Sequence, residues 1–525
     1  MHFNLNNTYT NELPADPVKE NHRRQVDACF SYVTPKQTKK PELIHVSDQM
    51  LAELGLTESD AESKEFLNVF TGNSVLKSTT PYAMSYGGHQ FGNWAGQLGD
   101  GRAINLFEID NNSKHWAVQL KGSGETPYSR TADGLAVLRS SIREYLCSEA
   151  MFHLGVPGTR ALSIAITGDD VKRDILYDGN PAYEKGAVVC RVAPTFIRFG
   201  NFQLLSAREN IKGLTQLVNY TVKHFYTEIE GDIKSKAIQL LEAVTKRTIK
   251  MIVDWQRVGF VHGVMNTDNM SILGQTIDYG PYGWLEGYDF NWTPNTTDNQ
   301  HKRYRFGNQP NIGLWNLFQL ANALFPLIKE SEPLQSILDS YQLKFDTQYH
   351  QMMKAKLGLN TEDKSDKRLI KILEENLQLA ETDMTLFFRN LTKISAQSVV
   401  GENDIIDSLL GIDDAFYTPL DVKKETILSW KDWLSMYINR LGRETNSNNK
   451  RIESMNLVNP KYVFRNYMAQ LAINDADKGD YQLIDELYQL FKNPYAEQPS
   501  MQKWFAKRPE WARHKVGCSM LSCSS

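Results

Sequence analysis

The sequence predicts an α+β protein in which a glycine-rich, strand-forming part precedes a larger helical part. From Pro81 onward glycine is frequent, and short apolar runs alternate with turn residues, as in strands joined by tight turns. From Leu214 onward apolar residues recur at helical spacing. A chain of 525 residues with 41% hydrophobic content can bury a large core, and at roughly 100–200 residues per domain it suggests about two to four compact units.

Charge and hydropathy argue against two classes of partner. The net charge is −4 with acidic and basic residues interspersed, so there is no long basic face for nucleic acid and no polybasic tract for a membrane surface. No run approaches the length of about 18 apolar residues needed to span a bilayer, and the N-terminus lacks the features of a signal peptide. We therefore expect a soluble, cytoplasmic protein. We also expect a monomer, although nothing in the sequence fixes the oligomeric state.

The sequence predicts strands and helices around the two motifs that are described next, the segment at His262 and the glycine-rich segment at Gly99. Apolar runs predict a hairpin from 103–107 and 116–121, turned at 110–112, and further strands near 162–166 and 187–192. An apolar face predicts a helix over 141–153. Apolar residues at helical spacing from Ala237 to Trp255 predict a long helix that leads directly into His262.

The segment that begins at His262 resembles a protein-kinase catalytic loop with one residue displaced. In kinases an aspartate base stands two residues after the histidine, but here that position is Val264. Asn269 and Asp278 stand where the two metal ligands should be, and the carboxylate of Asp268 lies beside Asn269. The loop therefore retains the ligands for nucleotide and metal while its base has moved.

We expect strands at 271–273 and 276–280, joined by a tight turn, to place Asp278 beside Asn269. Two oxygen ligands would then meet, as a hard cation such as Mg²⁺ or Mn²⁺ requires. The alternative is structural, because Asn-Thr-Asp-Asn at 266–269 is also ordinary turn material whose side chains bond their own backbone.

Glycines and one lysine precede this loop in the pattern of a phosphate-binding site. Gly99 and Gly101 would let backbone N–H groups approach phosphates, and the guanidinium group of Arg102 would add a positive charge with several donors. The alternative is that Gly-Asp-Gly is a hairpin turn, for which it is a common signal. Lys121 ends a predicted strand, and Glu144 lies in the next helix, as in the kinase lysine–glutamate pair. Alternatively Glu144 closes a capping box with Ser141.

Arg191 and Arg198 flank a proline that breaks any regular element between them. Two guanidinium groups can clamp a polyphosphate tail, a task that an ordinary kinase assigns to its lysine and metals. Separate surface ion pairs are the alternative for these arginines.

Several long motifs in a fixed order resemble the selenoprotein O family, also called YdiU. They cover nearly the whole chain and lie at 87–102, 119–130, 191–200, 262–273 and 459–466. The resemblance implies a protein-kinase-like two-lobed fold with a mixed N-lobe sheet, a large helical C-lobe and a C-terminal helical extension. The chain would then divide into an N-terminal wrap (1–75), an N-lobe with nucleotide-binding loops (76–205) and a helical C-lobe with the catalytic loop and a cysteine-containing tail (206–525).

The resemblance also implies the activity. Members of the family transfer AMP, and in some cases UMP, onto Ser, Thr or Tyr hydroxyls of proteins, with ATP or UTP bound in reverse so that the α phosphate faces the hydroxyl. Carried over by motif, Asp268 would be the base, Asn269 and Asp278 would bind Mg²⁺ or Mn²⁺, and Glu144 would orient Lys121. The remaining nucleotide contacts would come from Gly99, Gly101, Arg102, Lys121, Asp133, Gly134, Arg191, Arg198 and Asp278.

Two other activities remain open for the same residues. A phosphotransferase that uses the γ phosphate would release ADP instead of pyrophosphate. A catalytically inactive nucleotide-binding scaffold would be indifferent to the loss of Asp268.

Cysteine usage suits a reducing compartment. Cys29, Cys147 and Cys190 are scattered among apolar neighbours, whereas Cys518 and Cys523 lie close together in the C-terminal tail. A reversible disulfide between these two is geometrically allowed, and two incidental thiols are the alternative. The family resemblance implies that Cys523 stands at the selenocysteine position of eukaryotic members, and we expect Cys523→Ser to abolish any oxidant dependence of activity.

Overall fold

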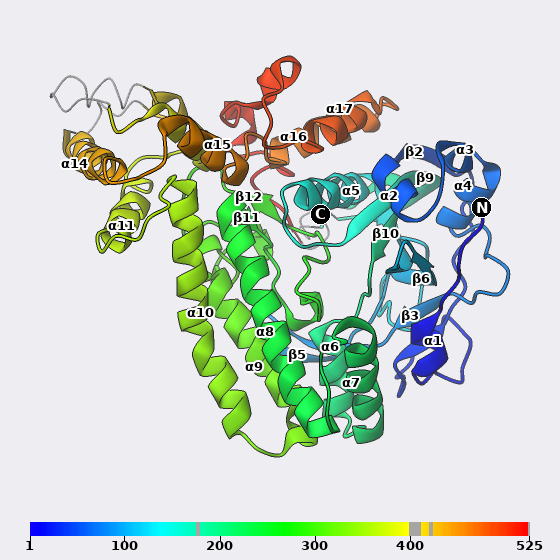
Figure 1. Cartoon of the computed structure of the whole chain (residues 1–525). Helices are drawn as coiled ribbons and strands as arrows, with labels where there is room; N and C mark the ends of the chain where they lie inside the picture. Colours follow the sequence, from blue (N-terminus) through cyan, green and yellow to red (C-terminus); the bar gives the residue numbers. More distant parts are fainter. Residues whose placement is uncertain (175–178, 398–410, 419–423, 523–525) are drawn as a thin grey trace.

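The computed structural model describes residues 1–174, 179–397, 411–418 and 424–522, and it has an antiparallel sheet with helices on both faces (Figure 1). The large sheet has the strand order β1-β3-β6-β7-β10-β9-β2, with β8 paired to β10. Its strands are β1 (Phe30–Tyr32), β2 (Glu42–Val46), β3 (Tyr82–Met84), β6 (Ala103–Asn111), β7 (Lys114–Lys121), β8 (Ala136–Val137), β9 (Arg160–Arg173) and β10 (Ala182–Ala193).

Every strand pairing of this sheet within the described residues is antiparallel, so the expected mixed sheet is wrong. The reason lies in the short connections, because a parallel pair needs a long crossover while β6 and β7 are joined by a two-residue turn. Asn112 and Ser113 form this turn with φ of 49° and 60°. Positive φ at both central residues matches the twist of the flanking strands.

The N-terminal residues complete the sheet at both edges, a role that the sequence did not reveal. β1 pairs with β3, and β2 pairs with β9. Three short helices follow β2 and cover one face of the sheet with Met50, Phe66 and Phe70, which pack on the buried side chains of β6, β7 and β10. They are α2 (Asp48–Glu53), α3 (Glu58–Ala61) and α4 (Lys64–Phe70), and α1 (Thr8–Glu12) lies nearer the N-terminus.

The other face of the sheet is covered by α5 (Leu138–His153), which packs on β9 and β10. Ile142 and Leu146 of this helix join the main core. Because side chains alternate along a strand, Val118 and Leu120 point toward α4 while Gln119 and Lys121 point toward α5. The polar side chains of β7 are thereby collected on one face.

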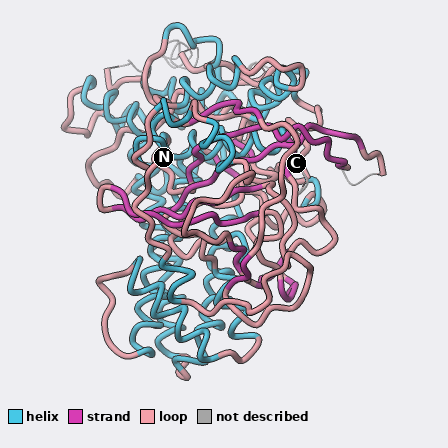
Figure 2. Tube along the Cα trace, turned by 90° about the vertical axis from the view of Figure 1, so that its right-hand side faces the viewer, coloured by secondary structure: helices cyan, strands magenta, loops and turns pink. Residues whose placement is uncertain are grey.

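The rest of the chain is mainly helical. Figure 2 shows the strands between helices that lie above and below them. The helices are α6 (Phe199–Ala207), α7 (Ile211–Phe225), α8 (Ile233–Val258), α9 (Gln309–Ile328), α10 (Glu332–Lys356), α11 (Asp366–Asn376), α12 (Met384–Asn390), α14 (Lys424–Leu441), α15 (Asn448–Val458), α16 (Asn466–Ala476) and α17 (Gln482–Phe491). In the part of the chain that the structure describes, none of them is both long and apolar enough to cross a lipid bilayer.

Two small hairpins frame the segment after α8. That helix ends at Gly259, whose φ of 76° is the left-handed conformation of a helix C-cap, and the chain continues into β11 (Phe260–Val261), which pairs with β12 (Gly283–Trp284). The second hairpin pairs β4 (Gly87–Gln90) with β5 (Asn93–Gln97). β4 packs against α6 and against the 3₁₀ turn at Thr267–Asn269.

Candidate active site

One cavity of about 790 Å³ gathers most of the residues that the motifs singled out. Its walls come from the glycine-rich segment before β6, the ends of β7 and β10, the loop after Ser123, and the segment that follows α8. The singled-out residues that line it are Gly99, Gly101, Arg102, Lys121, Asp133, Gly134, Arg191, Arg198, Asp268, Asn269 and Asp278.

Lys121 and Glu144 form a buried ion pair between β7 and α5. Burial lowers the pKa of Lys121 to about 8, even though the Glu144 carboxylate opposes this effect. Burial alone would raise the pKa of Glu144, but Lys121 and Arg191 hold it below its ordinary value. The helix begins at Leu138, so Ser141 lies inside it and the alternative capping box does not form.

Arg191 and Arg198 converge on Asp278 from two different elements. On β10, Arg191 donates from Nη1 to Asp278 Oδ1 at 2.6 Å and to Glu144 Oε1 at 3.0 Å. Arg198, at the N-terminus of α6, donates to Asp278 Oδ2 and also to the Asp268 carbonyl at 2.9 Å. Both arginine residues are 1% exposed, so the alternative of surface ion pairs does not apply.

Asp278 is the common partner of three cations. Burial would raise the pKa of this carboxyl, but Arg198, Arg191 and Lys121 hold it well below its ordinary range. Its φ of 60° is a left-handed conformation that is uncommon for residues other than glycine. Strain of this kind is concentrated at functional sites, where surrounding contacts maintain it.

The predicted hairpin after the catalytic loop is wrong. Instead of pairing with each other, the two sides bond to other segments, since Ile272 N donates to Ile197 O at 3.0 Å and Thr276 N donates to Pro157 O at 2.8 Å. Non-local partners thus replace the local turn. Asp278 nevertheless lines the same cavity as Asn269.

The donor set near Asn269 suits a hard cation. Asn269 donates from Nδ2 to Val264 O at 2.9 Å, which leaves its Oδ1 as the atom able to ligate. An amide oxygen and an ionised carboxylate are ligands that Mg²⁺ and Mn²⁺ accept. Asp278 would have to exchange its arginine contacts for the ion.

Asp268 lies in the 3₁₀ turn at Thr267–Asn269, where its carbonyl accepts from Arg198 while its carboxylate forms no ion pair within the described residues. It is 7% exposed, and its Oδ2 accepts a hydrogen bond from Gln90 Nε2 at 3.2 Å. Its Oδ1 is buried and has no hydrogen-bond partner among the described residues. Burial raises the pKa of Asp268 to about 6. This carboxyl can therefore accept a proton near neutral pH.

The two glycines before β6 are required by packing against Tyr128. A Cβ on Gly99 would lie 2.4 Å from Tyr128 Cγ, and one on Gly101 would lie 2.8 Å from the Tyr128 carbonyl oxygen. The Gly-Asp-Gly turn also does not join two paired strands, because β5 pairs with β4 whereas β6 pairs with β3 and β7. Both glycines still line the cavity. The close packing of their backbone on Tyr128 therefore holds this segment at the cavity wall.

Asp133 and Gly134 lie in the loop at the cavity rim. Asp133 is exposed and forms an ion pair with Arg173 at 2.7 Å. Gly134 has a φ of 69° and approaches Gly124 so closely that a Cβ would be 2.1 Å from its carbonyl oxygen.

Sequence reasoning missed three polar residues of the site. Gln119 bonds Arg191 across the β7–β10 pair, Asp100 lies 3.8 Å from Arg198, and Gln90 bonds Asp268. Gln119 was identifiable in principle because it shares a strand face with Lys121. Burial raises the pKa of Asp100, and nothing in the sequence around it signals that burial.

The described cysteines are all free. Cys29, Cys147, Cys190 and Cys518 are buried thiols. Burial raises the pKa of Cys518 to about 11, which makes it a poor nucleophile. Cys523 lies outside the described residues, so the tail disulfide stays a prediction.

Comparisons with known proteins identify the family of the chain. A family model described as protein adenylyltransferase SelO matches residues 17–492. A protein nucleotidyltransferase YdiU from Flavobacterium johnsoniae is 60% identical over 522 residues, which cover 99% of each chain. Proteins of the same name from Rhodopirellula baltica and Aromatoleum aromaticum are 52% and 50% identical, with 100% and 99% of each chain covered. The chain belongs to the SelO family.

Proposed function

We propose that this protein transfers AMP from ATP, or UMP from UTP, onto Ser, Thr or Tyr hydroxyls of other proteins and releases pyrophosphate. The family is one of protein adenylyltransferases, and the similar proteins are named protein nucleotidyltransferases. Nucleotidyl transfer is therefore favoured over a γ-phosphotransferase or an inactive scaffold. We also propose a two-lobed, kinase-like division into 76–205 and 206–525, with 1–75 added to the first lobe through the edge strands β1 and β2.

The observation that carries the proposal is the separation of charge within one cavity. Lys121, Arg191 and Arg198 cluster around Asp278. Asp268 lines the same cavity, and within the described ranges no lysine or arginine forms an ion pair with its carboxylate. A polyphosphate suits the cation cluster, and an uncompensated carboxylate suits a proton acceptor.

The reaction follows from this arrangement. The acceptor hydroxyl oxygen attacks the α phosphorus in line, the bond from that phosphorus to the bridging oxygen breaks, and pyrophosphate leaves with the bond electrons. Asp268 takes the hydroxyl proton, while Arg191 and Arg198 hold the departing phosphates and stabilise their charge. Glu144 keeps Lys121 in place. A metal ion held by Asn269 and Asp278 would add electrostatic stabilisation of the phosphate oxygens.

The test uses purified protein, acceptor proteins, Mg²⁺ and ATP labelled on either the α or the γ phosphate. We expect label on protein from α only, and its loss in Asp268→Ala. Asp268→Asn is the matched control for shape, since its side chain can still accept the Gln90 hydrogen bond, and it should be equally inactive. Label from γ would identify a kinase, and no label from either would favour the scaffold.

A further inference from the structure

A row of aromatic side chains begins beside the cavity and continues along α9. We call it the aromatic stripe, and its members are Trp94, His89, Trp315, Phe318 and Phe325. The His89 ring centroid lies 5.1 Å from that of Trp94 and 5.4 Å from that of Trp315. The stripe therefore joins the β4–β5 hairpin to α9 without a break at this point.

Along α9 the stripe follows helical spacing. Trp315, Phe318 and Phe325 recur at intervals of three and seven residues, while other faces of α9 pack on α6 and α8. Phe318 and Phe325 remain 45% and 44% exposed, and Trp94 on the hairpin is 42% exposed. Exposed apolar side chains that gather on one face mark interaction sites more often than single ones do.

The hairpin end of the stripe lies directly on the catalytic loop. His89 N donates to Thr267 Oγ1 at 2.7 Å, and Gln90 Nε2 donates to Asp268 Oδ2 at 3.2 Å. Gln90 and Phe91 line the same cavity as Asp268. A polypeptide lying on the stripe would thus reach the cavity beside the carboxylate that accepts the hydroxyl proton.

A cation borders the stripe at its centre. The Arg303 guanidinium lies over the Trp315 ring, 4.7 Å from its centroid, and within the described parts of the chain it forms no ion pair with a carboxylate. A Cβ on Gly92 at the hairpin turn would lie 3.5 Å from this guanidinium, so Arg303 sits between hairpin and helix. It can donate to a carbonyl or carboxylate of a bound chain.

We propose that the aromatic stripe is the docking surface for the protein acceptor, and that it binds an extended segment carrying apolar side chains next to the hydroxyl that is modified. The inference rests on the proposed function, because it assumes that the acceptor hydroxyl meets Asp268. Its continuity with the catalytic loop is what favours an acceptor over a second copy of this chain as the occupant.

The experiment compares Phe318→Ser/Phe325→Ser with a matched control, Leu343→Ser/Leu457→Ser. The control leucines are 73% and 74% exposed and lie on α10 and α15, outside the stripe. The initial rate of α-label transfer is measured against the concentration of a heat-inactivated cell extract as acceptor. Affinity for a fluorescent ATP analogue is measured in parallel, and light scattering gives the oligomeric state.

We expect the half-saturating acceptor concentration to rise about fivefold to tenfold in the phenylalanine variant, since truncating apolar anchors weakens binding. In the control it should stay within about twofold, the error of such comparisons, and affinity for the nucleotide analogue should change in neither. Trp94→Ser gives an independent test if the double variant does not fold.

Two results would overturn the inference while leaving the proposed function intact. The first is an unchanged acceptor dependence in the phenylalanine variant while Asp268→Ala is inactive. The second is conversion of a dimer into a monomer with no change in acceptor dependence, which would make the stripe a dimer interface. If the unsubstituted protein transfers no α label, the proposed function itself fails.

Discussion

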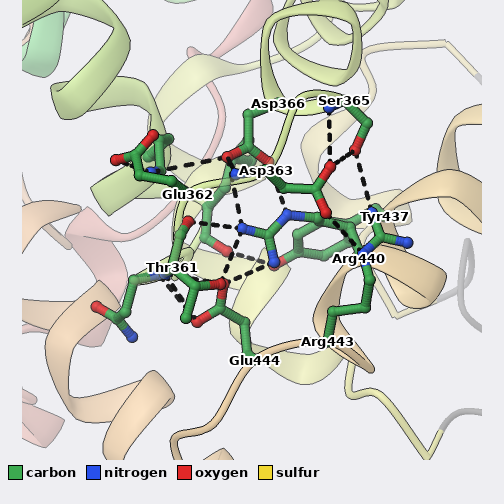
Figure 3. A network of polar contacts seen from close by, with 12 residues as sticks. Thr361, Glu362, Asp363, Ser365, Asp366, Tyr437, Arg440, Arg443 and Glu444 are labelled. Atoms are coloured by element: carbon green, nitrogen blue, oxygen red, sulfur yellow. Dashed lines mark hydrogen bonds and ion pairs between the residues drawn. The ribbon is translucent and has the colours of Figure 1, made fainter.

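Two buried clusters of arginine and carboxylate groups in this protein have opposite surroundings. The first consists of Lys121, Glu144, Arg191, Arg198 and Asp278 and lies at the wall of the cavity. The second joins the loop between α10 and α11 to α14, as Figure 3 shows. The residues labelled in this second cluster are Thr361, Glu362, Asp363, Ser365, Asp366, Tyr437, Arg440, Arg443 and Glu444.

The centre of the second cluster, around Arg440 and Asp366, is buried and fully paired, while Glu362 and Arg443 lie at its exposed edge. Arg440 is 1% exposed and donates to Asp366 Oδ1 at 2.7 Å, to Glu444 Oε1 at 2.7 Å and to Thr361 O at 2.8 Å. Asp366 is 0% exposed. The charges and hydrogen bonds of this buried centre are satisfied within the protein.

The cavity cluster contains three cations and two carboxylates, and the side chain of Asp278 is 23% exposed. Its contacts can therefore be exchanged for those of a phosphate or an ion that enters the cavity. Within the described residues, the difference between the two clusters is therefore access, because the cavity reaches the first and not the second. Elsewhere the same chemistry serves to hold elements together.

The largest expected effect is on activity, from Asp278→Asn. The substitution keeps the side-chain size but removes the charge that would bind metal, so transfer should fall by about 10³-fold, the scale of losing a preorganised electrostatic group. Direct Mn²⁺ binding in the presence of nucleotide, followed by electron paramagnetic resonance, should be lost in parallel. Asn269→Asp, which retains a ligand oxygen, is the control. Full activity in Asp278→Asn would remove this residue from the site.

The second prediction concerns stability, from Arg440→Met. Removing one partner of a buried pair leaves the other charge uncompensated, so the free energy of unfolding should fall by about 3–5 kcal/mol. Denaturant unfolding measures this loss. Transfer activity per folded molecule should remain unchanged, because the α10–α14 cluster does not line the cavity. A selective loss of nucleotide affinity would contradict the division between the two clusters.

The two clusters differ in how well their residues could be identified from the sequence. Lys121, Glu144 and the arginine pair were identifiable because each stands in a motif whose chemistry fixes the residue type. Nothing local marked Arg440 and Asp366, which are 74 residues apart and meet only through the packing of α11 on α14.

The same limit applies to the fold. Strands β6, β7, β9 and β10 were predicted from their apolar runs, although all four extend beyond the predicted ranges and the turn between β6 and β7 lies at 112–113 instead of 110–112. The two edge strands were not predicted, because β1 and β2 are short and their partners are distant in sequence. The prediction of a hairpin after the catalytic loop was wrong for a related reason, because the backbone of each side bonds to a segment that is distant in sequence.

The third prediction tests whether nucleotide affinity depends on the planar guanidinium group of an arginine in the cavity cluster, or only on its charge. Arg198→Lys retains the charge but loses the planar set of donors, so affinity for ATP should fall by about 10-fold to 100-fold. Arg443→Lys, in the other cluster, has a side chain that is 50% exposed and should leave affinity unchanged. Isothermal titration calorimetry with a non-hydrolysable nucleotide measures both. Equal affinity for Arg198→Lys and the unsubstituted protein would mean that charge alone suffices there.

The smallest expected effect concerns a second group of residues whose side chains can bind a metal ion. His350, Glu362 and Asp366 lie close enough together to hold an ion. However, Lys354 Nζ already lies 2.6 Å from Glu362 and 3.7 Å from Asp366, and Arg440 also bonds Asp366, so cations of the protein occupy this position. We expect Glu362→Gln to change the Mg²⁺ or Mn²⁺ dependence of transfer by less than about twofold, because its side chain is 84% exposed. A stoichiometric loss of bound Mn²⁺ in this variant would show that the second cluster, too, exchanges its partners for a ligand.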